Sequence, residues 1–124
     1  HYEVMHSERG RLLLFAKARR LGVILDESQR IKNPTSKATA ALHSLGPLLA
    51  RRVIMTGTPV ANRPYDIWSQ IYFLDSGESL GNSFASFKGY LIYHNFPFTS
   101  LWITSSSESA VRLTGSQFII RSPR

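Results

Sequence analysis

The spacing of apolar residues changes sharply within the first part of the chain. Over residues 8–20, apolar positions recur at helical spacing among basic residues, which predicts an amphipathic helix. The following run, 21–25, is almost continuously apolar, contains β-branched residues and stops at Asp26 and Glu27. Such a run is typical of a buried strand, so both carboxylates are expected at the carboxyl end of that strand.

A second helix and a second strand follow the acidic pair. Residues 33–36 offer capping oxygens and a proline, and apolar residues then recur at helical spacing up to Leu45, before a Gly-Pro stop. The run 52–55 has the composition of a strand and leads into the small polar segment 56–59. Strand, helix and strand in this order predict a parallel unit, with ligand chemistry beyond the carboxyl ends of both strands.

The pattern weakens toward the carboxyl terminus. A third helix is predicted to open at Pro64 and to end near Gly77. The aromatic-rich stretch 79–93 is expected to be helical in part, because its aromatic residues recur near helical spacing. A serine-rich connector over 104–109 then leads to a short apolar run at 118–120.

Composition narrows the class of protein without deciding it. With 124 residues, 43% of them hydrophobic, the chain can bury one modest core. The absence of cysteine excludes disulfides and thiolate metal sites, which favours an intracellular location, and no membrane partner is expected because no apolar run could cross a bilayer. A net charge of +7 suits a nucleic acid partner, but it suits an ordinary solvated surface equally well.

The Asp26-Glu27 pair is the strongest candidate for catalysis. Hydrolysis of a magnesium nucleotide needs an oxygen ligand for the hard cation and a neighbouring carboxylate that orients the attacking water. In this chemistry Asp26 would serve the metal and Glu27 the water. Acidic residues also commonly follow strands for structural reasons, so the pair alone leaves both interpretations open.

The surrounding sequence carries a family resemblance. The stretches VILDESQRIKN (23–33) and MTGTPVANRPYDIWSQIYFLD (55–75) closely resemble the second and third helicase motifs of Swi/Snf-type ATPases of superfamily two, in the same order. The resemblance extends more loosely from Tyr2-Glu3 to the segment 118–121. It implies an α/β fold, a partial RecA-like P-loop NTPase lobe with parallel strands and flanking helices. Residues 1–75 would form the carboxyl-terminal part of this first ATPase lobe. Residues 76–124 would add a mostly helical extension that ends in a short apolar segment.

The same resemblance assigns roles to individual residues. Asp26 coordinates Mg²⁺ through water, and Glu27 activates the hydrolytic water. Thr56, Gly57 and Thr58 couple the state of bound ATP to contact with double-stranded DNA. Taken by itself, the segment that holds these three residues is more typical of a plain turn. Chromatin, polymerase or other DNA-bound proteins are the further partners implied, in a bacterial cytoplasm or a nucleus.

Four positions after the acidic pair refine this picture. Ser28 and Gln29 stand where the family more often has alanine and histidine. Glutamine keeps a hydrogen-bond donor and an acceptor, so Gln29 is expected to bridge the two motifs as part of the catalytic group, although it cannot titrate as histidine does. Arg30 and Lys32 match the family's basic residues and are candidates for nucleic acid binding, with a solvated face as the alternative.

One essential part of an ATPase is missing from the sequence. A phosphate-binding loop needs glycines and a lysine, and no Gly-Lys pair occurs. By the resemblance, this loop is expected upstream of His1 and a second lobe downstream of Arg124. Residues 1–124 are thus expected to be an inactive fragment of an ATP-dependent translocase of double-stranded DNA. The alternative is a non-enzymatic nucleic acid or protein interaction module derived from such a lobe.

Overall fold

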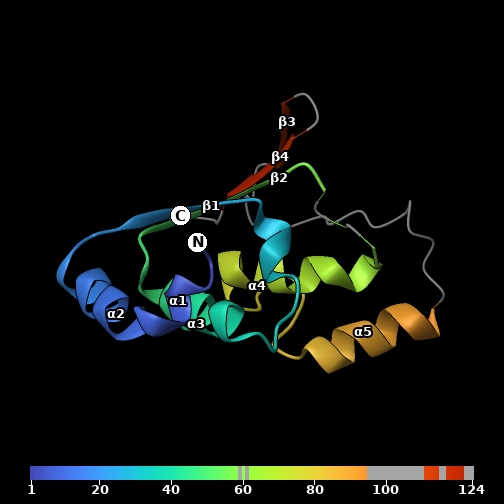
Figure 1. Ribbon diagram of the computed structural model, residues 1–124. Coiled ribbons are helices and arrows are strands. Elements are labelled where there is room, and N and C mark those ends of the chain that lie inside the picture. Colours follow the sequence, from blue (N-terminus) through green and yellow to red (C-terminus); the bar gives the residue numbers. More distant parts are fainter. Residues whose placement is uncertain (59, 61, 95–110, 115–116, 122–124) are drawn as a thin grey trace.

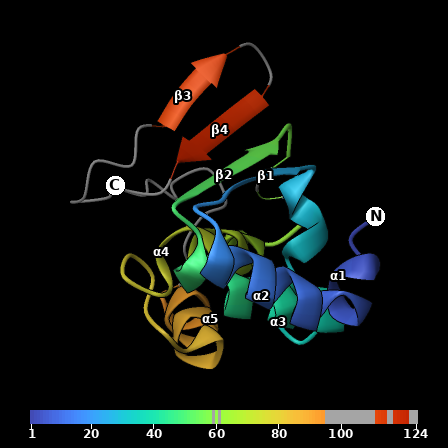
Figure 2. The same ribbon diagram turned by 90° about the vertical axis from the view of Figure 1, so that its left-hand side faces the viewer.

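A mixed sheet with helices on one face makes up the structure of the chain. The computed structural model describes residues 1–58, 60, 62–94, 111–114 and 117–121. Figures 1 and 2 show the helices gathered on the same side of the sheet. The predicted fold class is confirmed: parallel strands and flanking helices are compatible with a partial RecA-like lobe.

The helices and strands follow one another in nearly the predicted order. In chain order they are α1 (Val4–Ser7), α2 (Arg9–Ala18), β1 (Gly22–Asp26), the 3₁₀ turn η1 (Ser28–Ile31), α3 (Lys37–Leu45), η2 (Gly46–Leu48), β2 (Arg51–Thr56), η3 (Pro64–Ile67), α4 (Trp68–Asp75), α5 (Phe84–Tyr93), β3 (Val111–Thr114) and β4 (Gln117–Arg121). No helix among the described residues is long and apolar enough to span a bilayer.

The sheet has four strands in the order β1-β2-β4-β3. β1 and β2 pair in parallel with Asp26 opposite Met55, so the carboxyl ends of the two strands lie side by side. β4 pairs antiparallel with the other edge of β2, and β3 pairs antiparallel with β4. The parallel pair confirms the predicted strand, helix and strand unit. It places the segments that follow β1 and β2, which carry the two motifs, at the same end of the sheet.

The core lies between this sheet and the helical layer. Side chains alternate across β1, so Leu25 is buried while its neighbour Ile24 is 65% exposed. Leu25 and Ile54 are opposite each other on β1 and β2, and both belong to the buried cluster. α3 and α4 supply most of the remaining buried side chains, among them Leu42, Leu45, Ile71, Phe73 and Leu74. The residues after β1 and β2 are thus carried by a packed scaffold.

Two helices begin as their sequences indicate. Ser36 caps α3 by accepting a hydrogen bond from the Thr39 amide at 3.2 Å. The helix predicted from Pro64 is present in two parts, a 3₁₀ turn followed by α4. Asp66 stabilises the start of that turn by accepting a hydrogen bond from the Arg63 amide.

The segment beyond α4 is partly helical, as predicted, because α5 occupies residues 84–93. The expected serine-rich connector at 104–109 lies outside the described residues. The short apolar run at 118–120 forms the middle of strand β4, a pairing that the sequence pattern did not reveal.

Candidate active site

The two candidate carboxylates lie where the parallel strand ends. Asp26 is the last residue of β1, and Glu27 is the single residue between that strand and η1. Glu27 has φ 52° and ψ 49°, a left-handed conformation that residues other than glycine rarely adopt. Both side chains belong to solvent-exposed residues. The abrupt turn at Glu27 therefore directs a charged group outward instead of continuing the strand.

A chain of hydrogen bonds joins Glu27 to the end of the neighbouring strand. The Gln29 amide nitrogen donates to Glu27 Oε2 at 2.6 Å, and its carbonyl oxygen accepts from Thr56 Oγ1 at 2.5 Å. Thr56 Oγ1 in turn accepts from the Thr58 amide at 3.1 Å. The hydrogen-bond bridge expected of Gln29 is present, and it uses both the donor and the acceptor of the side chain.

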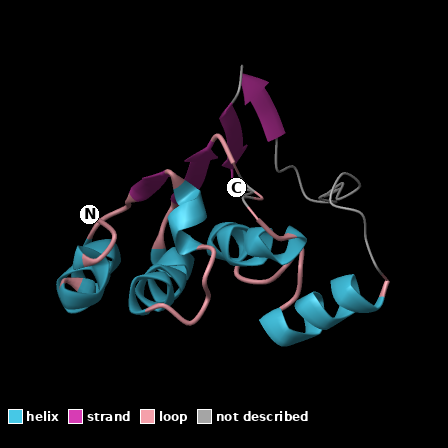
Figure 3. Ribbon diagram, turned by 45° about the vertical axis from the view of Figure 1, so that its right-hand side comes forward, coloured by secondary structure: helices cyan, strands magenta, loops and turns pink. Residues whose placement is uncertain are grey.

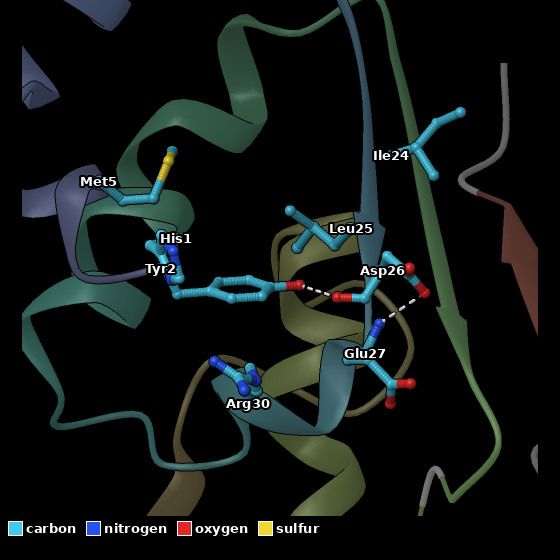
Figure 4. Close-up of a pocket in the computed structure, with 8 residues that line it drawn as sticks. All are labelled: His1, Tyr2, Met5, Ile24, Leu25, Asp26, Glu27 and Arg30. Atoms are coloured by element: carbon cyan, nitrogen blue, oxygen red, sulfur yellow. Dashed lines mark hydrogen bonds between the residues drawn. The ribbon is translucent and has the colours of Figure 1, made fainter.

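Asp26 is positioned through its backbone and through one carboxylate oxygen. Its Oδ1 accepts a hydrogen bond from the Glu27 amide at 2.9 Å, and its carbonyl oxygen accepts one from the Tyr2 hydroxyl (Figure 4). Among the described residues, Oδ2 has no hydrogen-bond partner. Burial raises the pKa of the Tyr2 hydroxyl, and the negative charge of Asp26 acts in the same direction, so Tyr2 remains a neutral donor.

The donor set suits magnesium held together with a nucleotide better than a metal held by protein alone. Among the described residues, no group of three or more histidine, aspartate or glutamate side chains could enclose an ion. Mg²⁺ usually keeps several waters and binds through one or two carboxylates plus substrate phosphates. A single exposed aspartate with one uncommitted oxygen fits that second arrangement.

A hollow of about 400 Å³ adjoins the acidic pair. It lies beside β1 and is lined by the amino-terminal segment, the strand and the first residues after it (Figure 4): His1, Tyr2, Met5, Ile24, Leu25, Asp26, Glu27 and Arg30. No residue of β2 contributes to its lining. Glu27 thus borders this hollow and also the hydrogen-bond chain that leads to β2.

A buried polar contact fixes the turn that carries these residues. Ser28 and Gln70 are both fully buried, and Ser28 Oγ donates to Gln70 Oε1 at 2.7 Å. Gln70 Nε2 also donates to the Asp66 carbonyl within the helical segment. This contact holds η1, which contains Gln29 and follows Glu27, against α4. Sequence analysis did not identify Gln70, although a glutamine at an apolar-face position of a helix was a usable signal.

The remaining candidate residues occupy different environments. Gly57 and Thr58 follow β2 and are exposed, whereas Thr56 is buried at 3% exposure. Arg30 is exposed and borders the hollow. Lys32 Nζ lies 4.0 Å from Asp66 Oδ2, with its side chain 34% exposed. Lys32 therefore forms an ion pair with a buried carboxylate, and its side chain is also partly exposed at the surface.

The fold and the arrangement of the two motif segments are compatible with a partial RecA-like lobe, and comparison with known families is more specific. The family model described as the SNF2-related domain matches residues 2–122. The chain belongs to this family. The resemblance of its two motif segments to Swi/Snf-type ATPases is thus confirmed.

Individual relatives match shorter stretches. A phage protein, "Putative protein p41" of Acyrthosiphon pisum secondary endosymbiont phage 1, is 40% identical over 70 residues, which cover 52% of this chain and 15% of that protein. The "Chromatin structure-remodeling complex protein SYD" of Arabidopsis thaliana is 33% identical over 87 residues, covering 70% of this chain and 2% of that protein. The human "Helicase-like transcription factor" is 45% identical over 54 residues, covering 44% of this chain and 5% of that protein. The chain spans only a small part of each relative, and no solved structure matches it.

Proposed function

We propose that this chain is part of a Swi/Snf-type motor that couples ATP hydrolysis to movement along double-stranded DNA. In this proposal Asp26 holds the magnesium ion of the nucleotide through water. Glu27 orients the attacking water and accepts its proton. Residues 1–75 form part of the first ATPase lobe, and residues 76–124 extend it.

The observation that carries the proposal is the hydrogen-bond chain from Glu27 through Gln29 to Thr56. It connects the carboxylate assigned to hydrolysis with the segment 56–58, which is assigned to coupling. A small movement of either strand end would alter both hydrogen bonds of Gln29, because they leave opposite atoms of one amide. The arrangement thus provides a direct physical link between nucleotide state and the loop after β2.

Bound magnesium would neutralise developing charge on the nucleotide phosphates during hydrolysis. Asp26 is the described residue suited to hold the ion, with Oδ2 available and Oδ1 fixed by the Glu27 amide. Glu27 Oε2 is occupied by Gln29, which restricts rotation of the carboxylate and leaves Oε1 to contact water. The protein groups therefore orient a proton acceptor next to the metal position.

The proposed partners follow from family membership and charge. SYD is named for chromatin remodelling, and the human relative is named as helicase-like. A net charge of +7 favours binding of a polyanion. Arg30 and Lys32, on the turn after β1, are the proposed contacts to duplex DNA. Chromatin or other DNA-bound proteins are further proposed partners, inside a nucleus or a bacterial cytoplasm.

Gln29 provides the test of the proposed coupling, in a full-length motor protein that contains this segment. Gln29→Leu removes both hydrogen bonds of Gln29 at similar side-chain volume. Thr56→Val removes the second of them, together with the hydrogen bond that Thr56 accepts from the Thr58 amide. We expect Gln29→Leu to lower DNA-stimulated ATP turnover by about tenfold or more, since a hydrogen bond to a charged group contributes about 1.5–3 kcal/mol. Thr56→Val should lower it less, because a hydrogen bond between neutral groups contributes about 0.5–1.5 kcal/mol.

The double variant controls for unrelated damage. If Gln29 and Thr56 act through one hydrogen-bond chain, the two losses should not add, and the double variant should be no slower than the slower single variant. Fully multiplicative losses would show that the two residues act independently. Unchanged turnover in Gln29→Leu would remove the coupling from the proposed function.

A further inference from the structure

A second group of charged side chains surrounds Tyr65, outside the site described above. The Arg63 guanidinium carbon lies 5.1 Å from the centroid of the Tyr65 ring, and Lys88 Nζ lies 5.0 Å from the same centroid. Arg63 immediately precedes η3, and Lys88 is on α5. Two cations from separate segments are therefore held next to one aromatic ring, which attracts both through its negative face.

The negative charge near this group is insufficient to neutralise it. Asp66 is 4% exposed and lies 3.8 Å from Arg63 Nε and 4.0 Å from Lys32 Nζ. One carboxylate is thus shared between two cations. Lys88 forms no ion pair with any of the residues that the structure describes. Lys32, Arg63, Tyr65, Asp66 and Lys88, here called the Tyr65 cluster, carry a net charge of about +2 at neutral pH.

The cluster is accessible from solvent. The Arg63 side chain is 58% exposed, and Tyr65 and Lys88 are partly exposed. Figure 3 shows α5 at the margin of the helical layer, next to the segment that leads into α4. Phe84 packs against both Tyr65 and Trp68, so the contact between η3 and α5 rests on a packed aromatic base. The cations are consequently presented by a defined surface.

We infer that the Tyr65 cluster binds the phosphate backbone of duplex DNA and extends the contact surface from η1 across to α5. Cations around one ring and one shared carboxylate leave an excess of positive charge, which attracts the phosphates of a duplex backbone. Exposed guanidinium and ammonium groups supply phosphate contacts without reading base sequence. This inference rests on the proposed function, because it assigns further residues to the same DNA contact.

Lys88 offers the cleanest test because no acidic residue in the described part depends on it. The experiment measures the equilibrium constant for binding of the whole 124-residue chain to a fluorescent DNA duplex of arbitrary sequence. The salt concentration is varied between about 50 and 200 mM. We expect Lys88→Gln to reduce the slope of log K against log salt by about 0.9, the value for one phosphate contact. Lys88→Arg should restore the slope, because it keeps the charge.

Arg11→Gln is the matched control, since Arg11 is an exposed cation already paired with Glu8 at 2.9 Å. It should leave the slope unchanged. A melting curve for each variant separates a structural role from a binding role. If Lys88→Gln lowers the melting temperature but not the slope, the Tyr65 cluster is structural and the inference is wrong. If the parent chain shows no salt-dependent binding to the duplex, DNA contact by this chain fails together with the inference.

Discussion

Glu27 shows how a single backbone conformation positions a charged group. Its left-handed φ of 52° is unfavourable for an L-residue by about 1–3 kcal/mol, so neighbouring contacts must stabilise it. The Glu27 amide donates to Asp26, and the next residue, Ser28, is anchored to Gln70. These two hydrogen bonds, one on either side of Glu27, stabilise its left-handed conformation. The direction of the carboxylate at the end of the strand is thereby fixed.

The Ser28–Gln70 contact should stabilise the fold measurably. Ser28→Ala removes one hydrogen bond from a buried glutamine and is expected to lower the free energy of unfolding by about 1–3 kcal/mol. Gln70→Leu removes the same hydrogen bond and also the one from Gln70 Nε2 to the Asp66 carbonyl, so the losses of the two single variants should not add in the double variant. Urea denaturation measures the three values. Ser7→Ala, at an exposed serine, serves as control, and an additive double variant would contradict the coupling.

The candidate site residues could be named from the two motif segments, but the residues that hold them in place could not. Asp26, Glu27 and Gln29 are close in sequence, so a single motif carries them. Tyr2 donates a hydrogen bond to the carbonyl of Asp26, 24 positions away, and no sequence spacing predicts such a contact. Lys32 was predicted as a nucleic acid contact, and only the fold brings it to Asp66.

Local sequence patterns predicted those helices and strands whose formation depends mainly on interactions between residues close in sequence. β1, α3 and β2 follow directly from an apolar run, a capped helical period and a second apolar run. The helix predicted from Pro64 is divided because the contacts of Asp66 close a 3₁₀ turn before α4 begins. β4 could not be predicted, since its formation depends on pairing with β2, some sixty residues earlier.

The contact between α3 and α4 should make stability depend on pH. His43 Nε2 lies 2.9 Å from the Ser69 carbonyl oxygen, and the ring lies 4.6 Å from that of Tyr72. Burial lowers the pKa of His43 below the usual 6.5, although the backbone hydrogen bond opposes this shift. The unfolded chain therefore binds a proton that the folded chain excludes. Stability should be complete above about pH 6.5 and should fall as the pH decreases further.

The measurement is the free energy of unfolding at about pH 7.5 and at about pH 5, which lie on either side of the ordinary pKa of histidine. His43→Phe keeps an aromatic ring in this position and should show a smaller difference between the two values. His6→Gln, at an exposed residue of α1, should retain the full difference. An identical pH dependence in His43→Phe would show that other groups cause it.

For the whole molecule, the sheet is only partly enclosed. The described helices cover one face, and Ile24 on the other face is 65% exposed (Figure 1). β1 is an edge strand of the sheet that the described residues form. The matched stretches cover only 2% of SYD and 15% of the phage relative. Catalysis is therefore best tested in a full-length motor that contains this segment.

The most direct measurement compares Glu27→Gln with Asp26→Asn in that full-length motor. Glu27→Gln keeps side-chain shape but removes the proton acceptor, so nucleotide affinity should persist while turnover falls by about 10²–10⁴-fold. Asp26→Asn should also weaken magnesium-dependent nucleotide affinity, because that residue is assigned to the metal. Near-normal ATP turnover in Glu27→Gln would contradict the assignment of this carboxylate to hydrolysis and, with it, the proposed function.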